Sequence, residues 1–212
     1  MPKVDIEIVS DFVCPWCLIG TRRLEQALEA MPEVEAGWTY QPFMLDPTTP
    51  PEGVDLRERL RRKYGDPEPL FRRVEAAARE SGIELDFERV RRGVSTLRAH
   101  TLSRAAIERG TQRALVRDLF VAYFVDGRDI SAMDVLLELG SRHGFSQAEV
   151  LALLESPAEL QTTREDARAA AEGGVTGVPF VVVGRRFGVP GAQPPEVFQR
   201  AISRALDQAA TT

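Results

Sequence analysis

Residues 11–20 read DFVCPWCLIG and hold both cysteines of this 212-residue chain. The preceding residues 4–10, VDIEIVS, alternate apolar and polar side chains, which predicts a strand with one buried face. From Leu18 to Pro32 the apolar residues recur at helical spacing instead. The cysteine pair is therefore predicted to occupy the turn between a strand and the start of a helix.

Further strand patterns occur near both ends of the chain. Residues 34–43 predict a second strand, and the right-handed crossover rule makes the first two strands parallel. Residues 178–184 form an apolar, β-branched run typical of a buried strand, and residues 185–189 can return as its hairpin partner. Residues 194–206 predict the last helix.

The middle of the chain predicts helices only. No strand is expected from Asp55 to about Ser156, and six segments there show helical periodicity: 56–64, 70–81, 96–109, 114–125, 133–143 and 147–154. A further helix is expected over residues 157–172. The order matches an α/β thioredoxin fold with a large all-helical insertion. Residues 1–53 and 157–212 would form the thioredoxin-like domain, and residues 54–156 the insertion.

Composition and charge exclude several classes of protein. The net charge is −5 and the pI about 5.3, so the overall field repels nucleic acid and anionic lipid. No apolar run is long enough to cross a bilayer, so we expect no membrane association. Residues 1–10 lack the continuous apolar core of a secretory signal, which predicts a cytoplasmic location.

The pair Cys14 and Cys17 allows three interpretations. A structural disulfide would close a very short loop and constrain the unfolded chain little. A zinc site needs two further ligands, but the only histidines, His100 and His143, lie outside any zinc-motif spacing, so no metal is expected. A reactive dithiol is the remaining interpretation.

A physical reason favours the reactive dithiol. At a helix start, the free amides of Trp16 and Cys17 would point toward the Cys14 sulfur, and the helix dipole would stabilise a thiolate there. Pro15 suits the first helical position and stiffens the turn. Cys14 is expected to be exposed and to form a mixed disulfide with a partner, which the more buried Cys17 then resolves.

A second signal lies at the sequence Gly177-Val178-Pro179-Phe180, where a proline opens the predicted buried strand. Local statistics favour a trans bond before Pro179, but a proline that cannot donate to a ladder needs an explanation there. A cis Val178–Pro179 bond packed against the dithiol would expose the backbone of Val178. An extended substrate could then add to it as a strand.

With these motifs in place, the chain resembles the DsbA-like branch of the thioredoxin superfamily. It looks most like FrnE-type cytoplasmic proteins, the neighbours of 2-hydroxychromene-2-carboxylate isomerase and of kappa-class glutathione transferases. The motifs that carry the resemblance follow the family's order along almost the whole chain: SDFVCPWCLIG, PFMLDP, STLRAHTLSRAA, LFVAYFVDGRDIS, GVTGVPFVVV and GVPGAQPPEVF.

The resemblance implies roles for individual residues. Cys14 would be the nucleophile, Cys17 the resolving thiol and Pro179 the cis-proline, with the helical block as a lid over the cleft. Ser95 stands where the family has asparagine, so a ligand contact from that position is in doubt. The chain also lacks the second cysteine pair that some FrnE-type proteins carry near the C-terminus, which excludes an internal dithiol relay.

Four residues form the predicted substrate-binding group: Trp16, Val178, Pro15 and His100. Trp16 is interpreted as an exposed docking surface, with a buried packing role as the alternative. The family places the helix of His100 near the cleft, but an ordinary half-buried histidine is the better interpretation. Asp11 is expected to serve a cap or a turn.

Three functions remain open from the sequence. The leading one is a thiol-disulfide oxidoreductase acting on protein or small-molecule disulfides and dithiols, as a monomer or homodimer. It needs no cofactor, with glutathione as an alternative co-substrate. The second is a glutathione-dependent isomerase or transferase, although such relatives usually have serine at the position of Cys14. The third is a redox sensor without turnover.

Overall fold

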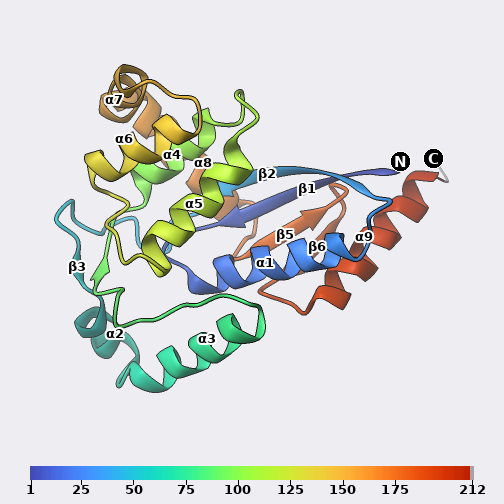
Figure 1. The fold of residues 1–212 in the computed structure, drawn as a ribbon, viewed down its shortest axis with the longest axis horizontal. Helices are drawn as coiled ribbons and strands as arrows, with labels where there is room; N and C mark the ends of the chain where they lie inside the picture. The colour runs from blue at the N-terminus through green and yellow to red at the C-terminus, as the bar shows by residue number, and fades with distance from the viewer. Residues whose placement is uncertain (211–212) are drawn as a thin grey trace.

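One mixed sheet of four strands organises the molecule, and the computed structural model describes residues 1–210 (Figure 1). The strands lie in the order β2-β1-β5-β6, and their bounds are β1 (Lys3–Ser10), β2 (Glu35–Pro42), β5 (Phe180–Val183) and β6 (Phe187–Pro190). β1 and β2 are parallel, as predicted, whereas β5 runs antiparallel to β1 and β6 antiparallel to β5. The two ends of the chain therefore build one sheet.

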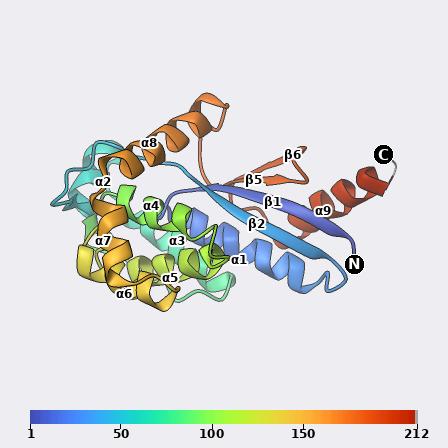
Figure 2. The same cartoon turned by 90° about the horizontal axis from the view of Figure 1, so that it is seen from above.

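The helices divide into two groups around this sheet. α1 (Pro15–Glu29) packs against α9 (Pro195–Ala210), which also contacts β1, β5 and β6. The other helices gather at the carboxyl ends of β1 and β2, away from both termini (Figures 1 and 2). They are α2 (Leu56–Tyr64), α3 (Glu68–Glu80), α4 (Leu97–Ala105), α5 (Gln112–Phe124), α6 (Met133–Arg142), α7 (Gln147–Glu155) and α8 (Pro157–Glu172). This arrangement confirms the predicted α/β thioredoxin fold with inserted helices.

Three details differ from the sequence prediction. Val54–Asp55 (β3) pairs with Arg92–Gly93 (β4), so the inserted segment is not all-helical; a two-residue pairing is too short to produce a periodic pattern. The helix predicted over 96–109 ends at Ala105 and continues as hydrogen-bonded turns to Gly110. The last helix extends to Ala210 instead of ending at 206.

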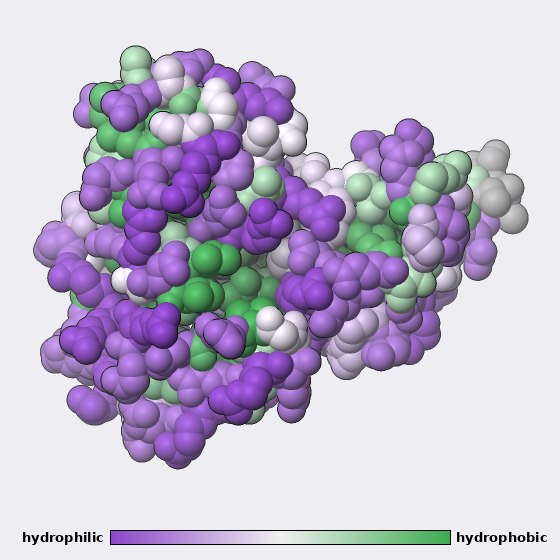
Figure 3. All heavy atoms as spheres, viewed as in Figure 1, coloured by the Kyte–Doolittle hydropathy of each residue, from purple (hydrophilic) through white to green (hydrophobic). Residues whose placement is uncertain are grey.

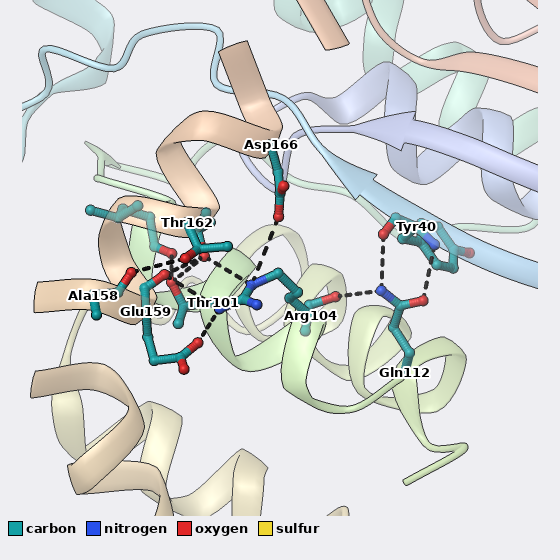
Figure 4. Close-up of polar contacts among 11 residues, drawn as sticks. Tyr40, Thr101, Arg104, Gln112, Ala158, Glu159, Thr162 and Asp166 are labelled. Atoms are coloured by element: carbon teal, nitrogen blue, oxygen red, sulfur yellow. Dashed lines mark hydrogen bonds and ion pairs between the residues drawn. The ribbon is translucent and has the colours of Figure 1, made fainter. Parts of the chain in front are cut away.

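Gln112 ties the inserted helices to the edge of the sheet. Its side-chain amide donates to the carbonyl of Tyr40 over 2.9 Å, and its side-chain oxygen accepts from the Tyr40 N–H over 2.9 Å (Figure 4). Exposed backbone groups of an edge strand would otherwise attract another chain. The pairing therefore protects the edge of β2 and holds Tyr40 in place.

A buried polar contact joins α4 to α8. Thr101 donates to the hydroxyl of Thr163 over 2.9 Å, and both side chains are fully buried. Arg104 forms ion pairs with Glu159 and Asp166 at the rim of this contact (Figure 4). These bonds anchor α8 before the chain returns to the sheet. Within residues 1–210, no helix is long and apolar enough to cross a membrane.

Candidate active site

The cysteine pair lies where β1 passes into α1. β1 ends at Ser10 and α1 begins at Pro15, so Cys14 occupies the cap position, with extended backbone angles (φ −94°, ψ 109°). The Cys14 N–H donates to the carbonyl of Asp11 over 3.1 Å, and the Cys17 N–H donates to the carbonyl of Cys14 over 3.0 Å. These bonds close a tight turn that starts the helix, with proline at the predicted position.

The surroundings of the Cys14 sulfur correct two expectations. The Cys14 side chain makes no cap hydrogen bond, because its own carbonyl takes the Cys17 amide instead. Cys14 is also buried, with 5 % of its surface exposed, whereas an exposed thiol was expected. Its thiol donates to the carbonyl of Val178 over 3.5 Å. Packing against this distant loop covers the sulfur, and the local sequence carries no information about that contact.

The Val178–Pro179 peptide bond is cis, and Pro179 packs against α1. A side chain in place of the hydrogen of Gly20 would approach the Pro179 ring to 2.9 Å and the backbone of Ala192 to 3.3 Å. The Pro179 carbonyl accepts the N–H of Gly191 over 2.8 Å. Glycine at position 20 therefore lets α1 and the proline loop approach closely enough for Cys14 to meet Val178.

Cys17 is completely buried, which agrees with its expected position one turn inside the helix. Burial raises the pKa of its thiol well above the ordinary value of 9.0, and the neighbouring Cys14 raises this pKa further. The backbone of Asp11 and the hydroxyl of Ser10 act in the opposite direction and lower the pKa of Cys17. Both cysteines are free thiols, so the structure represents the reduced dithiol.

The raised pKa of Cys17 predicts a loss of stability in alkali. Above about pH 9 the unfolded chain releases the Cys17 proton while the folded protein keeps it, so unfolding becomes easier as the pH rises toward the folded pKa. The unfolding free energy of the reduced wild type should fall by up to about 1.4 kcal/mol per pH unit more than that of Cys17→Ala. Urea unfolding with reductant between pH 8 and 10.5 measures this difference, and equal slopes would contradict it.

Asp11 and His100 form a buried polar pair beside the cysteine turn. Asp11 is 1 % exposed and His100 5 % exposed, and His100 Nε2 lies 3.3 Å from Asp11 Oδ1. The other carboxyl oxygen accepts the N–H of Leu45 over 2.8 Å, and the imidazole packs on the ring of Phe12. Asp11 takes part in the expected turn only through its backbone carbonyl, which accepts the Cys14 N–H, while its side chain bonds to distant residues. His100 is more deeply buried than expected and contacts the cysteine turn through Asp11.

Trp16 has part of its side chain in the core and part at the surface. It is half-buried against the core, and the guanidinium of Arg73 lies 5.6 Å from the centre of its ring. The space-filling view shows apolar side chains gathered over the start of α1, between α5 and α3 (Figure 3). This apolar area offers a contact surface next to the cysteine turn.

Ser95, which stands where the family has asparagine, lines a cleft of the structure. This cleft has a volume of about 390 Å³ and is also lined by Arg98 and Arg164. Neither Cys14 nor Cys17 is among the residues that line this cleft. Within the described part of the chain, no group of three His, Cys, Asp or Glu side chains could hold a metal ion.

Ser10 is a polar residue beside the cysteine turn that the sequence pattern did not indicate. It is 3 % exposed and lies near enough to Cys17 to affect the pKa of that thiol. The available signal was a serine at the end of an apolar strand directly before the cysteine turn. Its burial becomes visible only when β2 pairs with β1 and α4 lies beside them, because residues of both elements surround Ser10.

The fold and the paired thiols define a class of protein. A Cys-x-x-Cys dithiol at the start of a helix in a thioredoxin fold is the arrangement found in thiol-disulfide oxidoreductases. The chain belongs to the family of the DSBA-like thioredoxin domain, which matches residues 5–203.

Solved structures agree with this membership. The probable DsbA oxidoreductase SCO1869 from Streptomyces coelicolor is 36% identical and has a TM-score of 0.87, covering 97% of this chain and 91% of its own. A 2-hydroxychromene-2-carboxylate isomerase shares the fold at 18% identity and TM-score 0.75, with 98% of each chain covered. The cytosolic disulfide reductase DsbM from Pseudomonas aeruginosa, solved with GSH, does so at 19% identity and TM-score 0.62, again with 98% of each chain covered.

These comparisons confirm the predicted resemblance to DsbA-like proteins and to their isomerase neighbour. The chain therefore belongs to the DsbA-like family of oxidoreductases. The narrower FrnE-type assignment stays a prediction.

Proposed function

We propose that this protein is a thiol-disulfide oxidoreductase in which Cys14 is the nucleophile and Cys17 the resolving thiol. The Cys14 sulfur attacks one sulfur of a partner disulfide, and the other partner sulfur leaves with the electron pair and takes up a proton. Cys17 then attacks Cys14, which releases the second partner thiol and leaves a Cys14–Cys17 disulfide. The partner is reduced, the dithiol is oxidised, and the reverse sequence oxidises a partner.

One observation carries this proposal: two free thiols lie at the start of α1, with the outer one against the Val178 carbonyl. The two cysteines differ in burial, because Cys14 retains some exposure and Cys17 has none. A partner sulfur can therefore reach Cys14 first. Replacement of the Cys14–Val178 hydrogen bond by a partner's backbone would let an extended segment dock at this loop.

The limited exposure of Cys14 favours a partner that is small or extended near its disulfide. A small-molecule disulfide or an extended peptide loop fits such an opening better than a flat folded surface. Oxidised glutathione is a small-molecule disulfide of this kind, and the structural neighbour DsbM was solved with GSH, its reduced form. The proposal includes glutathione as a co-substrate and a cytoplasmic location. Trp16 and Val178 lie at the proposed docking site, and Pro179 completes that site.

The Cys17→Ser variant should trap partners as mixed disulfides on Cys14. Without the resolving thiol, the first exchange step proceeds and the second cannot, so adducts accumulate. Incubation with oxidised glutathione, followed by intact mass measurement, should show one glutathione adduct per chain in this variant. The wild type should instead lose two mass units and carry no stable adduct.

Matched variants separate this function from the two alternatives. Cys14→Ser and the Cys14→Ser/Cys17→Ser double variant should form no adduct. Glutathione conjugation or isomerisation that survives Cys14→Ser would identify the isomerase or transferase function instead. Oxidation that changes partner binding without any turnover would identify a sensor. Partner proteins released from Cys17→Ser by reductant would name the physiological substrates.

A further inference from the structure

A cleft of about 390 Å³ lies between the loop that follows β2, the start of α4 and one face of α8. Its walls are mostly apolar, with side chains from the loop (Met44, Pro47 and Pro51), from α4 (Leu97) and from α8 (Leu160). Sites for small molecules have volumes of this order and combine apolar walls with a few polar groups. The size and lining of this cleft therefore suit a small ligand.

Three polar side chains in this cleft have no partner within residues 1–210. The guanidinium groups of Arg98 and Arg164 form no hydrogen bond, ion pair or ring contact there, and the hydroxyl of Ser95 forms no hydrogen bond. Arg164 lies one turn after Leu160 on α8, so these two side chains share a face of the helix. Two cations and a hydroxyl are thus available to a ligand that also contacts the apolar walls.

The charge of this cleft has one sign. None of the residues that line it is acidic, although the chain as a whole carries a net charge of −5. Two other clefts mix the signs: Asp5 and Glu7 accompany Arg185 in one, and Asp55 and Glu58 accompany basic side chains in the other. A cleft lined by one sign of charge concentrates ions of the opposite sign. The ligand that fits is therefore an anion.

Hydrogen bonds hold the walls of the cleft in place. The Leu45 N–H donates to the buried carboxyl of Asp11 over 2.8 Å, and Arg59 donates to the hydroxyl of Thr49 over 2.9 Å. The loop after β2 is thus fixed at two points, and a buried threonine contact joins α4 to α8. Walls that are already ordered lose little conformational entropy when a ligand binds.

We propose that this cleft binds a small organic anion that has an apolar body and a carboxylate or sulfonate group. Arg98 and Arg164 donate hydrogen bonds to the anionic group, because a guanidinium presents paired N–H donors that match its oxygens. The Ser95 hydroxyl donates a further bond, and the apolar body packs against Leu97 and Leu160. Binding does not depend on the proposed thiol chemistry, since neither cysteine lines the cleft.

Fluorescence titration with 8-anilinonaphthalene-1-sulfonate tests the site, because this probe has an apolar body and one anionic group. N-phenyl-1-naphthylamine has the same rings without the sulfonate and is the neutral control. Arg98→Gln and Arg164→Gln should each weaken binding of the sulfonate probe about fivefold, the upper range for an exposed pair of charges. Both variants should leave binding of the neutral probe unchanged.

Arg168→Gln is the matched control variant. Arg168 is exposed and lies one turn after Arg164 on α8 but does not line the cleft, so its loss changes the net charge equally. Its affinity for the sulfonate probe should equal that of the wild type. Cys14→Ser should also bind the probe as the wild type does. Circular dichroism and urea unfolding of the arginine variants should match the wild type, because these side chains are exposed.

Competition defines the chemistry of the ligand. 4-Phenylbutyrate, a carboxylate with an apolar body, should displace the sulfonate probe, whereas inorganic phosphate at the same ionic strength should not. Equal displacement by phosphate, equal weakening in Arg168→Gln or unchanged affinity in both cleft variants overturns the proposal. Arginine-dependent binding in a protein whose Cys17→Ser variant traps no adduct would instead overturn the oxidoreductase function alone.

Discussion

The Cys14→Ser variant should lose thiol-disulfide exchange activity by at least about 1,000-fold, because a serine hydroxyl does not attack disulfides near neutral pH. Cys17 cannot replace it, since Cys17 is fully buried and its pKa is raised by that burial. Initial rates of insulin reduction, with dithiothreitol as the electron donor, measure the effect.

The fold should tolerate this substitution. Cys14 occupies the cap position of α1, where serine is one of the preferred residues. Circular dichroism and urea unfolding of Cys14→Ser should therefore match those of the reduced wild type. A folded variant that retained more than about a tenth of the wild-type rate would be incompatible with Cys14 as the nucleophile.

The Asp11→Ala variant should lower the unfolding free energy by about 2–4 kcal/mol, one of the largest effects available to a single polar residue here. The substitution removes the acceptor of the Leu45 N–H and the partner of His100, and both Asp11 and His100 are buried. Each group left without a partner carries a desolvation cost. Urea unfolding at neutral pH measures the loss.

A double-mutant cycle isolates the contribution of the pair. His100→Ala and the Asp11→Ala/His100→Ala variant complete the cycle, and a coupling energy of about 1 kcal/mol or more is expected for buried groups in direct contact. Glu108→Ala, at an exposed site, provides a control with little expected change. A loss below about 0.5 kcal/mol in Asp11→Ala would show that the pair does not hold the cysteine turn in place.

The Asp11 pair also connects the inserted helices to the cysteine turn. Asp11 lies in the turn between β1 and α1, whereas His100 lies in α4. Their contact joins the cysteine turn directly to the inserted part of the chain. We therefore expect the substitution to slow disulfide exchange as well as to destabilise the fold.

Much of the fold could be predicted because its signals are local. The alternation over residues 4–10, the helical spacing after Leu18 and the apolar run before Gly184 each reflect burial of one side of a single element. The parallel pairing of the first two strands follows from the helix that connects them, because parallel strands need a crossover connection of about this length. Pairing as short as β3 with β4 gives no such pattern, and sequence periodicity could not reveal it.

The chemistry of the cysteine turn was only partly predictable. Two cysteines separated by proline and tryptophan, directly before a helix pattern, were sufficient to indicate a dithiol whose second thiol is the more buried. The expectation that amides cap the Cys14 sulfur was wrong, because the Cys14 carbonyl competes for the Cys17 amide. The expectation that Cys14 is exposed was wrong as well, because a distant loop covers it.

The sequence by itself determined the order of the elements, the start of α1 at Pro15 and the spacing of the two thiols, since all of these depend on neighbours within a few residues. Only the tertiary structure decided what surrounds each sulfur. The contact of Cys14 with Val178 spans 164 positions in the chain, and that of Asp11 with His100 spans 89. Burial, hydrogen-bond satisfaction and the cost of a charge depend on every segment that packs around a group, and those segments meet only when the whole chain has folded.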